Sequence, residues 1–121
     1  MLITRIETLF GKGPYQNDKT MIDLYSELPF GVQPNPFDDG ANWFPSPNQY
    51  FGFASHDQLL KWFNPSYFAC EEQLKHMASK DMYVVEYDVE DKYVVCLNSQ
   101  VMFDRSKAFP VSRMPLAELV I

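Results

Sequence analysis

The sequence predicts an α+β fold built on a small, mainly antiparallel, split or curved β-sheet with two or three short helices. The first observation behind this prediction is composition, because 46% hydrophobic and 21% charged residues are typical of a globular chain. The second is length, since 121 residues suffice for one hydrophobic core and leave no room for another. The third is order, because strand patterns and helix patterns follow one another without regular alternation. We therefore expect residues 1–121 to form a single domain.

The N-terminal part predicts a strand, a turn and a short helix. Residues 2–10 alternate in the manner of a strand, and a Gly-Lys-Gly-Pro sequence ends it, because glycine adopts turn conformations and proline cannot donate to a sheet. Tyr15 is then delivered from a turn beside the end of the strand. Residues 18–28 predict a short helix with Asn17 or Asp18 as its N-cap.

A long segment at residues 29–49 matches neither a helix nor a strand. It contains many prolines and several aromatic residues, among them Phe30, Trp43 and Phe44. Long loops in compact domains are usually functional or disordered. Because a disordered linker rarely contains so many rings, we expect this segment to pack against the body of the domain.

The centre of the chain is a junction at residues 50–63, where an aromatic strand turns through Ser55 directly into a helix. Ser55 and Gln58 match a capping box, in which the serine accepts a hydrogen bond from the helix and the glutamine bonds back. This structural role explains Ser55 on its own. A helix N-terminus also attracts anionic ligand groups, so a binding role stays open.

The second half of the chain predicts another helix and then a run of strands. A helix pattern covers residues 67–80 and strand alternation begins directly after it. We expect strands at 82–89, 93–97 and 100–104, and short extended pieces at 108–111 and 116–121.

Composition also limits the classes of function. The net charge of −6 and the scattered basic residues argue against a nucleic-acid binder, whose affinity depends on clustered lysine and arginine. Cys70 and Cys96 lack metal-ligand spacing and have apolar neighbours, which favours buried free thiols over a disulfide. No apolar run is long enough to span a membrane, so we expect a cytoplasmic protein.

Two polar residues stand out at the ends of this pattern. Arg5 lies inside an apolar strand, so it either projects into a cleft, pairs with a carboxylate such as Glu7, or keeps its charged end in water at a sheet edge. Gln100 leads into an apolar strand, where its neutral amide can orient a ligand by hydrogen bonds but cannot act as a base.

Taken in order, three short motifs resemble the ADP-ribosyltransferase-like superfamily, in a small phage- or prophage-type form. They are the arginine strand at residues 4–6, the aromatic-serine strand at 50–55 and the strand opening at 98–103. The resemblance implies NAD as the cofactor and Arg5, Ser55 and Gln100 as the catalytic set.

The same resemblance implies a binding surface for NAD formed by Arg5, Tyr15, Phe51, Phe53 and Ser55, with the loop at residues 29–49 lying over the ligand. Gln100 stands where that superfamily usually has a glutamate. Since the glutamate's negative charge stabilises the transition state, the resemblance implies an NAD-binding or ADP-ribose-binding domain whose transferase activity is weak or degenerate.

Two other classes of function remain open. The first is a small acidic protein that occupies a host or target protein's surface, such as an inhibitor or a phage host-modulating factor with no enzymatic activity. The second is an accessory domain with no small-molecule site. Convergence of Arg5, Ser55 and Gln100 on one cleft is the observation that discriminates among them.

Overall fold

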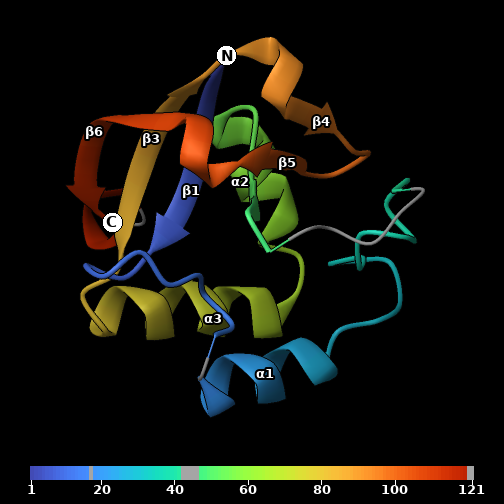
Figure 1. The fold of residues 1–121 in the computed structure, drawn as a ribbon. Helices are drawn as coiled ribbons and strands as arrows, with labels where there is room; N and C mark the ends of the chain where they lie inside the picture. The colour runs from blue at the N-terminus through green and yellow to red at the C-terminus, as the bar shows by residue number, and fades with distance from the viewer. Residues whose placement is uncertain (17, 42–46, 120–121) are drawn as a thin grey trace.

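The computed structural model describes residues 1–16, 18–41 and 47–119. The chain has an α+β fold in which two three-stranded antiparallel sheets lie above the helices α3 (Phe68–Ser79) and α1 (Lys19–Ser26) in the view of Figure 1. The predicted fold class is therefore confirmed.

The first sheet has the strand order β1-β3-β6 and is formed by β1 (Leu2–Glu7), β3 (Tyr83–Val89) and β6 (Ala108–Pro115). Arg5 on β1 faces Val85 on β3 in this antiparallel register. The last strand is longer than the short extended piece expected at residues 108–111, because its pairing with β3 continues past a register shift between Glu86 and Tyr87.

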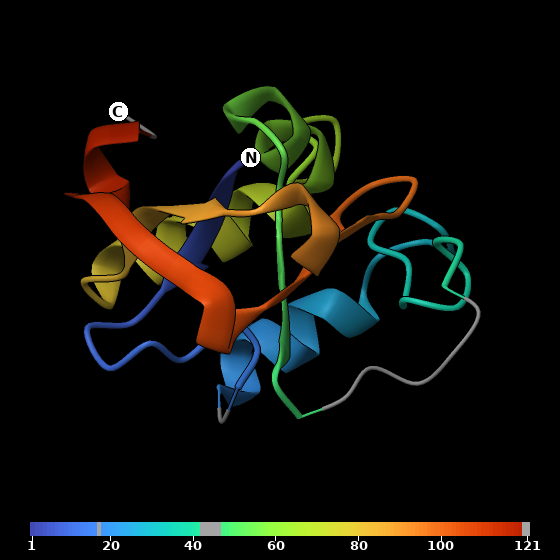
Figure 2. The ribbon, with the colours of Figure 1, turned by 45° about the horizontal axis from the view of Figure 1, so that its top comes forward.

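The second sheet has the order β2-β5-β4 and is formed by β2 (Gln49–Gly52), β4 (Val94–Cys96) and β5 (Val101–Asp104). Within the described ranges, a single antiparallel bridge joins it to the first sheet. Thr4 and Phe53 each donate a backbone hydrogen bond of 2.7 Å to the other's carbonyl oxygen. Figure 2 shows β1 passing close to the extended segment that contains β2. The split sheet expected from the sequence is thus two sheets that meet at β1.

The described residues form four α-helices: α1 (Lys19–Ser26), α2 (His56–Trp62), α3 (Phe68–Ser79) and α4 (Leu116–Leu119). Asp18 caps α1 by accepting from the Met21 amide at 3.1 Å, and Ser55 caps α2 by accepting from the Gln58 amide at 3.1 Å. Both predicted caps are confirmed; the alternative cap, Asn17, lies outside the described residues. Single 3-10 turns at Asp91–Tyr93 and Arg105–Lys107 connect the last strands.

The expectation of an extended piece at residues 116–121 is wrong for its described part. Residues 116–119 form α4, because the Leu116 amide donates to the carbonyl oxygen of Met82 at 2.9 Å and its side chain is completely buried. A chain anchored there turns away from the sheet. The last two residues of the expected piece lie outside the described residues.

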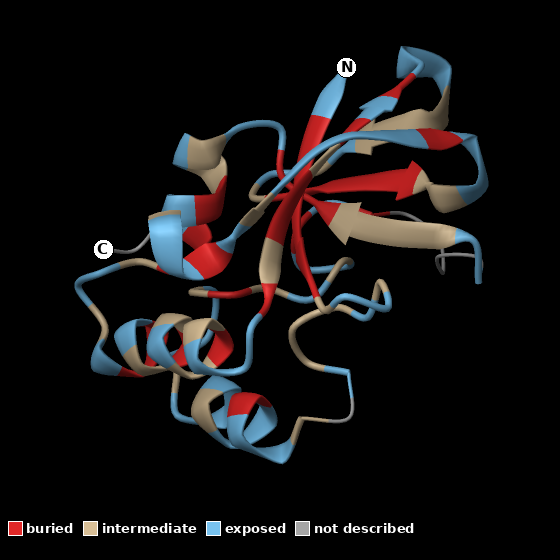
Figure 3. Cartoon of the chain, turned by 90° about the vertical axis from the view of Figure 1, so that its left-hand side faces the viewer, coloured by how far each residue is buried: buried red, intermediate tan, exposed pale blue. Residues whose placement is uncertain are grey.

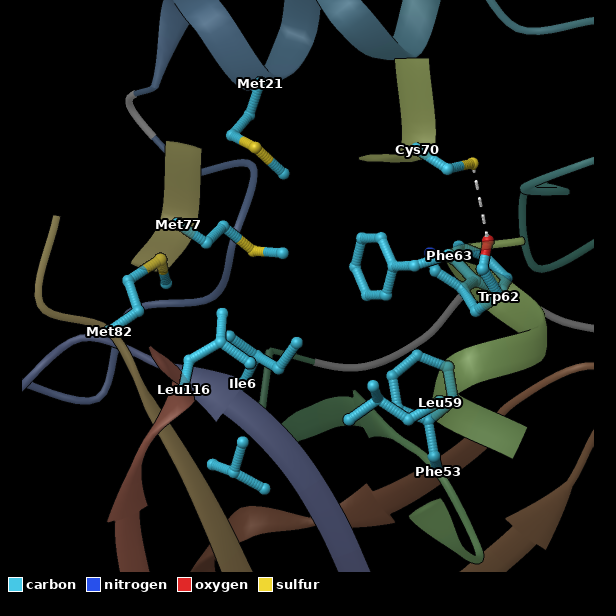
Figure 4. Packing of buried hydrophobic residues seen from close by; sticks show 11 residues of the cluster. Ile6, Met21, Phe53, Leu59, Trp62, Phe63, Cys70, Met77, Met82 and Leu116 are labelled. Atoms are coloured by element: carbon cyan, nitrogen blue, oxygen red, sulfur yellow. Dashed lines mark hydrogen bonds between the residues drawn. The ribbon is translucent and has the colours of Figure 1, made fainter. Parts of the chain in front are cut away.

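The hydrophobic core has one part on each face of the first sheet. The first part lies between the two sheets and includes Ile3, Tyr87 and Phe103. The second part lies between the sheet and the helices, where Met21 of α1, Met77 of α3 and Ile6 of β1 belong to one cluster (Figure 4). Buried positions accordingly gather on the middle of the strands and on the inward faces of the helices (Figure 3).

The loop at residues 29–49 packs against the body in its described parts, as expected. Gln33, Asp39 and Ala41 are buried. Trp43 and Phe44, on which the expectation partly rested, lie outside the described residues.

Both cysteines are free thiols, but only one is buried. Cys70 is a buried residue of α3, whereas Cys96, at the end of a short strand, is exposed, so the prediction of burial is wrong for Cys96. β4 is a three-residue strand at the edge of its sheet, so the side chain of Cys96 is exposed to water. None of the helices in the described ranges is long and apolar enough to cross a bilayer.

Candidate functional site

A cavity of about 660 Å³ opens beside the junction of the two sheets. Its walls come from β1, β2, the turn that contains Tyr15, and the C-terminal part of α1. Five of the six residues proposed from the sequence line it: Arg5, Tyr15, Phe51, Phe53 and Gln100. The volume falls within the range of small-molecule sites.

Arg5 is the cation of this cavity and is only 8% exposed. Its guanidinium lies over the ring of Tyr50, 4.9 Å from the ring centroid, and its Nε lies 3.2 Å from Oε2 of Glu7. Burial lowers the pKa of Arg5 and the charge of Glu7 opposes this effect, yet a guanidinium stays protonated in proteins. The sequence left three possibilities for Arg5: a cleft, a pair with Glu7, or an exposed position at a sheet edge. In the structure Arg5 both lines the cavity and pairs with Glu7.

The contact between Arg5 and Glu7 is an ion pair without a hydrogen bond. Although Nε and Oε2 are 3.2 Å apart, both atoms are buried and neither has a hydrogen-bond partner among the described residues. The other oxygen of Glu7, Oε1, accepts a hydrogen bond of 2.5 Å from the hydroxyl of Tyr87. The carboxylate therefore divides its oxygens between two partners.

Two of the nitrogens of Arg5 have no hydrogen-bond partner in the described part of the chain. Neither Nη1 nor Nη2 donates a hydrogen bond to any described residue, whereas Nε faces Glu7. Gly13 flanks these nitrogens so closely that a Cβ there would lie 3.2 Å from Nη2. The glycine keeps this side of the guanidinium open.

Gln100 approaches the cavity from the second sheet, directly before β5, and is 6% exposed. Its backbone carbonyl accepts from the Leu97 amide at 2.9 Å, which fixes the turn between β4 and β5. Its side-chain amide makes no hydrogen bond with the described residues. An amide without a partner in the described ranges can both donate a hydrogen bond and accept one.

Tyr15 forms a fixed aromatic wall. Its hydroxyl donates to Oε1 of Gln33 at 2.6 Å and accepts from Nε1 of Trp62 at 3.2 Å. Its ring meets that of Tyr25 edge to face, with centroids 5.7 Å apart. Burial raises the pKa of Tyr15 far above its usual value, so the hydroxyl stays protonated.

Behind this wall, two buried glutamines connect the loop at residues 29–49 to α3. Gln33 donates through Nε2 to Oε1 of Gln73 at 2.8 Å, and Gln73 donates back to Oε1 of Gln33 at 3.3 Å. Gln33 also donates to the backbone carbonyl of Trp62 at 3.2 Å. Buried amides need partners of this kind, so the network holds the loop and Tyr15 in place.

Ser55 does not share the cavity. It lines a separate hollow of about 590 Å³ together with Asn98 and Ser99, and its hydroxyl is engaged by the amide of Gln58. Oε1 of Gln58 accepts from the amide of Ala54 at 2.7 Å, so the reciprocal bond expected of the capping box goes to the residue before the cap and not to Ser55 itself. The structure therefore brings Arg5 and Gln100 together without Ser55.

The charge of the cavity is unlike that of the protein. The chain carries a net charge of −6, yet of the described residues that line the cavity none is aspartate, glutamate, lysine or histidine. Arg5 is joined there by the neutral amides of Gln16, Asn35, Gln49 and Gln100. An anionic group would meet one cation and no opposing carboxylate in the lining.

Tyr50 and Tyr87 were not identified from the sequence as site residues. Tyr50 supports the guanidinium of Arg5 and lines the cavity, while Tyr87 holds Glu7. A weak signal exists for Tyr50, because a buried arginine needs an aromatic face or a carboxylate nearby. Tyr87 lies about 80 residues from Glu7 in sequence and gives no such signal.

Comparison with known proteins assigns the family. The family model described as Bacteriophage T4 Y00F protein matches residues 1–117, almost the whole chain. The chain belongs to the bacteriophage T4 Y00F protein family. No solved structure matches.

A curated relative of this Y00F family member comes from Enterobacteria phage T4 and is described as an uncharacterized 19.7 kDa protein in the motB-dexA intergenic region. It is 37% identical over 59 residues. The match covers 49% of this chain and 32% of the relative, so the chain spans about a third of the length of that protein.

The Y00F assignment corrects the resemblance to the ADP-ribosyltransferase-like superfamily, which is wrong. Neither the family nor the relative is an ADP-ribosyltransferase by description. The three motifs were short, and one of them has a local explanation, since Ser55 is a helix cap outside the cavity that contains Arg5 and Gln100. The phage character expected from the sequence is confirmed.

Proposed function

We propose that this phage protein binds a small ligand that combines a flat ring with an anionic group, a nucleotide being the closest match, in the cavity beside Arg5. One observation carries the proposal. Arg5 and Gln100 reach the same cavity from different sheets, both more than nine-tenths buried, with side-chain atoms that hydrogen-bond to no described residue. A ligand gains these hydrogen bonds without displacing a protein partner.

The lining supports this class of ligand. The terminal nitrogens of Arg5 suit the two oxygens of a phosphate or carboxylate, because a guanidinium presents its donors as a planar fork. The rings of Tyr15 and Phe51 offer apolar faces to a base, and the amide of Gln100 can bond to its edge or to a ribose hydroxyl. NAD and ADP-ribose are larger members of the same class.

We propose that the cavity binds its ligand without catalysing a reaction. Proton transfer near neutral pH needs a group such as a carboxylate, an imidazole or a lysine, and the described lining residues include none of these. The one charged lining residue, Arg5, stays protonated.

Thermal unfolding and calorimetric titration test the proposal with adenosine monophosphate (AMP), NAD, ADP-ribose and uncharged adenosine. A ligand at a concentration of about 100 times Kd adds about 2.7 kcal/mol to the free energy of unfolding by mass action. We expect the phosphate-bearing compounds to raise the Tm more than adenosine does. If none of the four raises the Tm, the proposal is wrong.

Two glutamine variants sharpen the test. Gln100→Met keeps the size of a side chain that has no described partner, so we expect weaker binding and unchanged stability. The matched control is Gln58→Met, which lies outside the cavity; we expect it to lower stability by about 1 kcal/mol through loss of the bond from the Ala54 amide and to leave affinity nearly unchanged. Equal affinity of wild type and Gln100→Met would contradict the assigned site.

A second candidate function is binding of a host or target protein by an acidic surface. Several exposed phenylalanines favour it, above all Phe10 at 89% and Phe30 at 90% exposure, on a chain with a net charge of −6. Binding of a purified host protein that is lost in Phe10→Ser or Phe30→Ser, kept in Arg5→Ala and Ser55→Ala, and weakened by salt would support it. Binding that depends on Arg5 would oppose it.

Both candidate functions assume that the protein acts in the cytoplasm of the host cell, where nucleotides and host proteins are both accessible to it. Fluorescence microscopy of a tagged chain during infection tests this location. Signal confined to the envelope would contradict it.

A further inference from the structure

Arg5 is in contact with Glu7, a carboxylate that does not line the cavity. Arg5 has two described neighbours that orient it, the ring of Tyr50 below and Oε2 of Glu7 at Nε. A guanidinium and a carboxylate that are free to choose their geometry form two parallel hydrogen bonds. Here the contact at 3.2 Å is not aligned as even one hydrogen bond, although both atoms are buried.

The hydroxyl of Tyr87 accounts for this misalignment. It donates to the other oxygen of Glu7 at 2.5 Å, a short charge-assisted hydrogen bond. A carboxylate held at Oε1 from one side cannot rotate to present both oxygens to Arg5. Glu7 therefore neutralises the arginine without occupying its terminal nitrogens.

Tyr87 is itself held firmly. It is 1% exposed, its ring packs against Phe103 with centroids 5.9 Å apart, and the guanidinium of Arg105 covers it at 4.5 Å. Burial and the adjacent charge of Glu7 raise the pKa of Tyr87 to about 12, so its hydroxyl remains a donor at any physiological pH. The geometry is fixed before any ligand arrives.

We propose that Tyr87 is a positioning residue for the ligand site: its hydroxyl holds Glu7 to a contact at Nε of Arg5 and so reserves Nη1 and Nη2 for the anionic group of the ligand. This inference rests on the proposed nucleotide binding. It predicts that without the hydroxyl the carboxylate of Glu7 turns, pairs with the terminal nitrogens of Arg5 and competes with the ligand.

Calorimetric titration of Tyr87→Phe with AMP and with adenosine tests the effect on binding. We expect the affinity for AMP to fall about tenfold, as for the loss of a hydrogen bond to a charged group, while the affinity for adenosine stays the same. The double variant Tyr87→Phe with Glu7→Gln should recover AMP binding, because a neutral amide does not compete for the guanidinium. A merely structural role of Tyr87 would weaken both ligands alike and would not be rescued.

Tyr83→Phe is the matched control. Tyr83 lies on the same strand, packs against Arg113 at 5.4 Å, and its hydroxyl makes no hydrogen bond with the described residues. We expect it to bind AMP like wild type. If Tyr83→Phe loses as much affinity for AMP as Tyr87→Phe, the inference is wrong.

A crystal structure of ligand-free Tyr87→Phe separates this inference from the proposed function. The expected result is a two-bond contact between Glu7 and Arg5, and an unmoved carboxylate overturns the inference even if AMP binds wild type. Failure of wild type to bind AMP, NAD or ADP-ribose overturns the proposed function, whatever the carboxylate does in the variant.

Discussion

Gly52 lies so close to Thr4 that a Cβ at Gly52 would stand 2.8 Å from the carbonyl oxygen of Thr4 and 2.7 Å from Cγ2 of Ile3. The first of these atoms belongs to the backbone of β1 and cannot rotate away. The meeting of the two sheets, and therefore the shape of the cavity, depends on the absence of a side chain at this position.

Gly52→Ala should therefore destabilise the protein by about 1–3 kcal/mol, the usual cost of overpacking a core. Urea denaturation measures the loss. Gly13→Ala is the comparison, because its added Cβ would meet only the flexible end of Arg5 at 3.2 Å. We expect it to change ligand affinity more than stability. An equal loss of stability in both variants would contradict this explanation.

Ser55→Ala should lower the free energy of unfolding by about 1 kcal/mol, the usual cost of losing an N-cap. The affinity for AMP should not change, since Ser55 lines the hollow beside Asn98 and not the cavity. Ser66→Ala is a suitable control, because Ser66 is exposed and its hydroxyl has no hydrogen bond with the described residues. A loss of affinity in Ser55→Ala at unchanged stability would return Ser55 to the site.

Asp18 should make stability depend on pH in the acidic range. Partial burial acts to raise its pKa, but the Met21 amide and the ring of His76, at 2.9 Å, outweigh this effect, so the pKa is lowered from its ordinary value of 3.8. A lowered folded-state pKa gives stability that is complete above the unfolded-state value and is lost as the pH falls through the folded-state value.

Asp18→Asn keeps a good N-cap but removes this charge. Wild type should exceed the variant in free energy of unfolding at pH 6, and the difference should shrink as the pH falls from about 5 toward 3. Urea denaturation across this range measures it. Asp23→Asn, in the exposed pair with Lys19, should show little of this dependence. A difference independent of pH would exclude the charge of Asp18 as its source.

The two thiols should differ widely in reactivity. Cys96 is exposed and should react quickly with an aromatic disulfide reagent in the native protein. Cys70 is buried, its pKa is raised by that burial, and it should react only when the chain unfolds. Cys96→Ser should abolish the fast phase, and fast labelling that persists in this variant would contradict the burial of Cys70.

The local parts of the fold could be predicted from the sequence because their causes are local. Asp18 and Ser55 mark helix starts through the bonds of their own side chains, and the alternation at residues 82–89 identified β3 within one residue. The end of the chain could not be predicted in this way. Leu116 starts a helix because of its burial and its bond to Met82, which is distant in sequence.

The candidate site, like the fold, could be predicted only where the sequence signal is local. Arg5 and Gln100 were notable because a polar residue at the start of or inside an apolar strand requires an explanation. Nothing in the sequence indicates that Glu7 is bonded to Tyr87, or that Gln33 and Gln73 pair behind Tyr15, because both contacts depend on the packing of segments far apart in the chain. The residue types indicated which side chains are costly to bury alone. The identity of their partners became clear only from the fold.

The bridge between Thr4 and Phe53 affects how rigidly the two sheets beside the cavity are joined. Among the described residues, the two sheets exchange backbone hydrogen bonds at this pair alone. Arg5 lies on β1 of the first sheet, and Gln100 directly precedes β5 of the second sheet. A molecule bound by both side chains would therefore link the two sheets. Occupancy would then be measurable as stiffness, in slower amide exchange at Thr4 and Phe53.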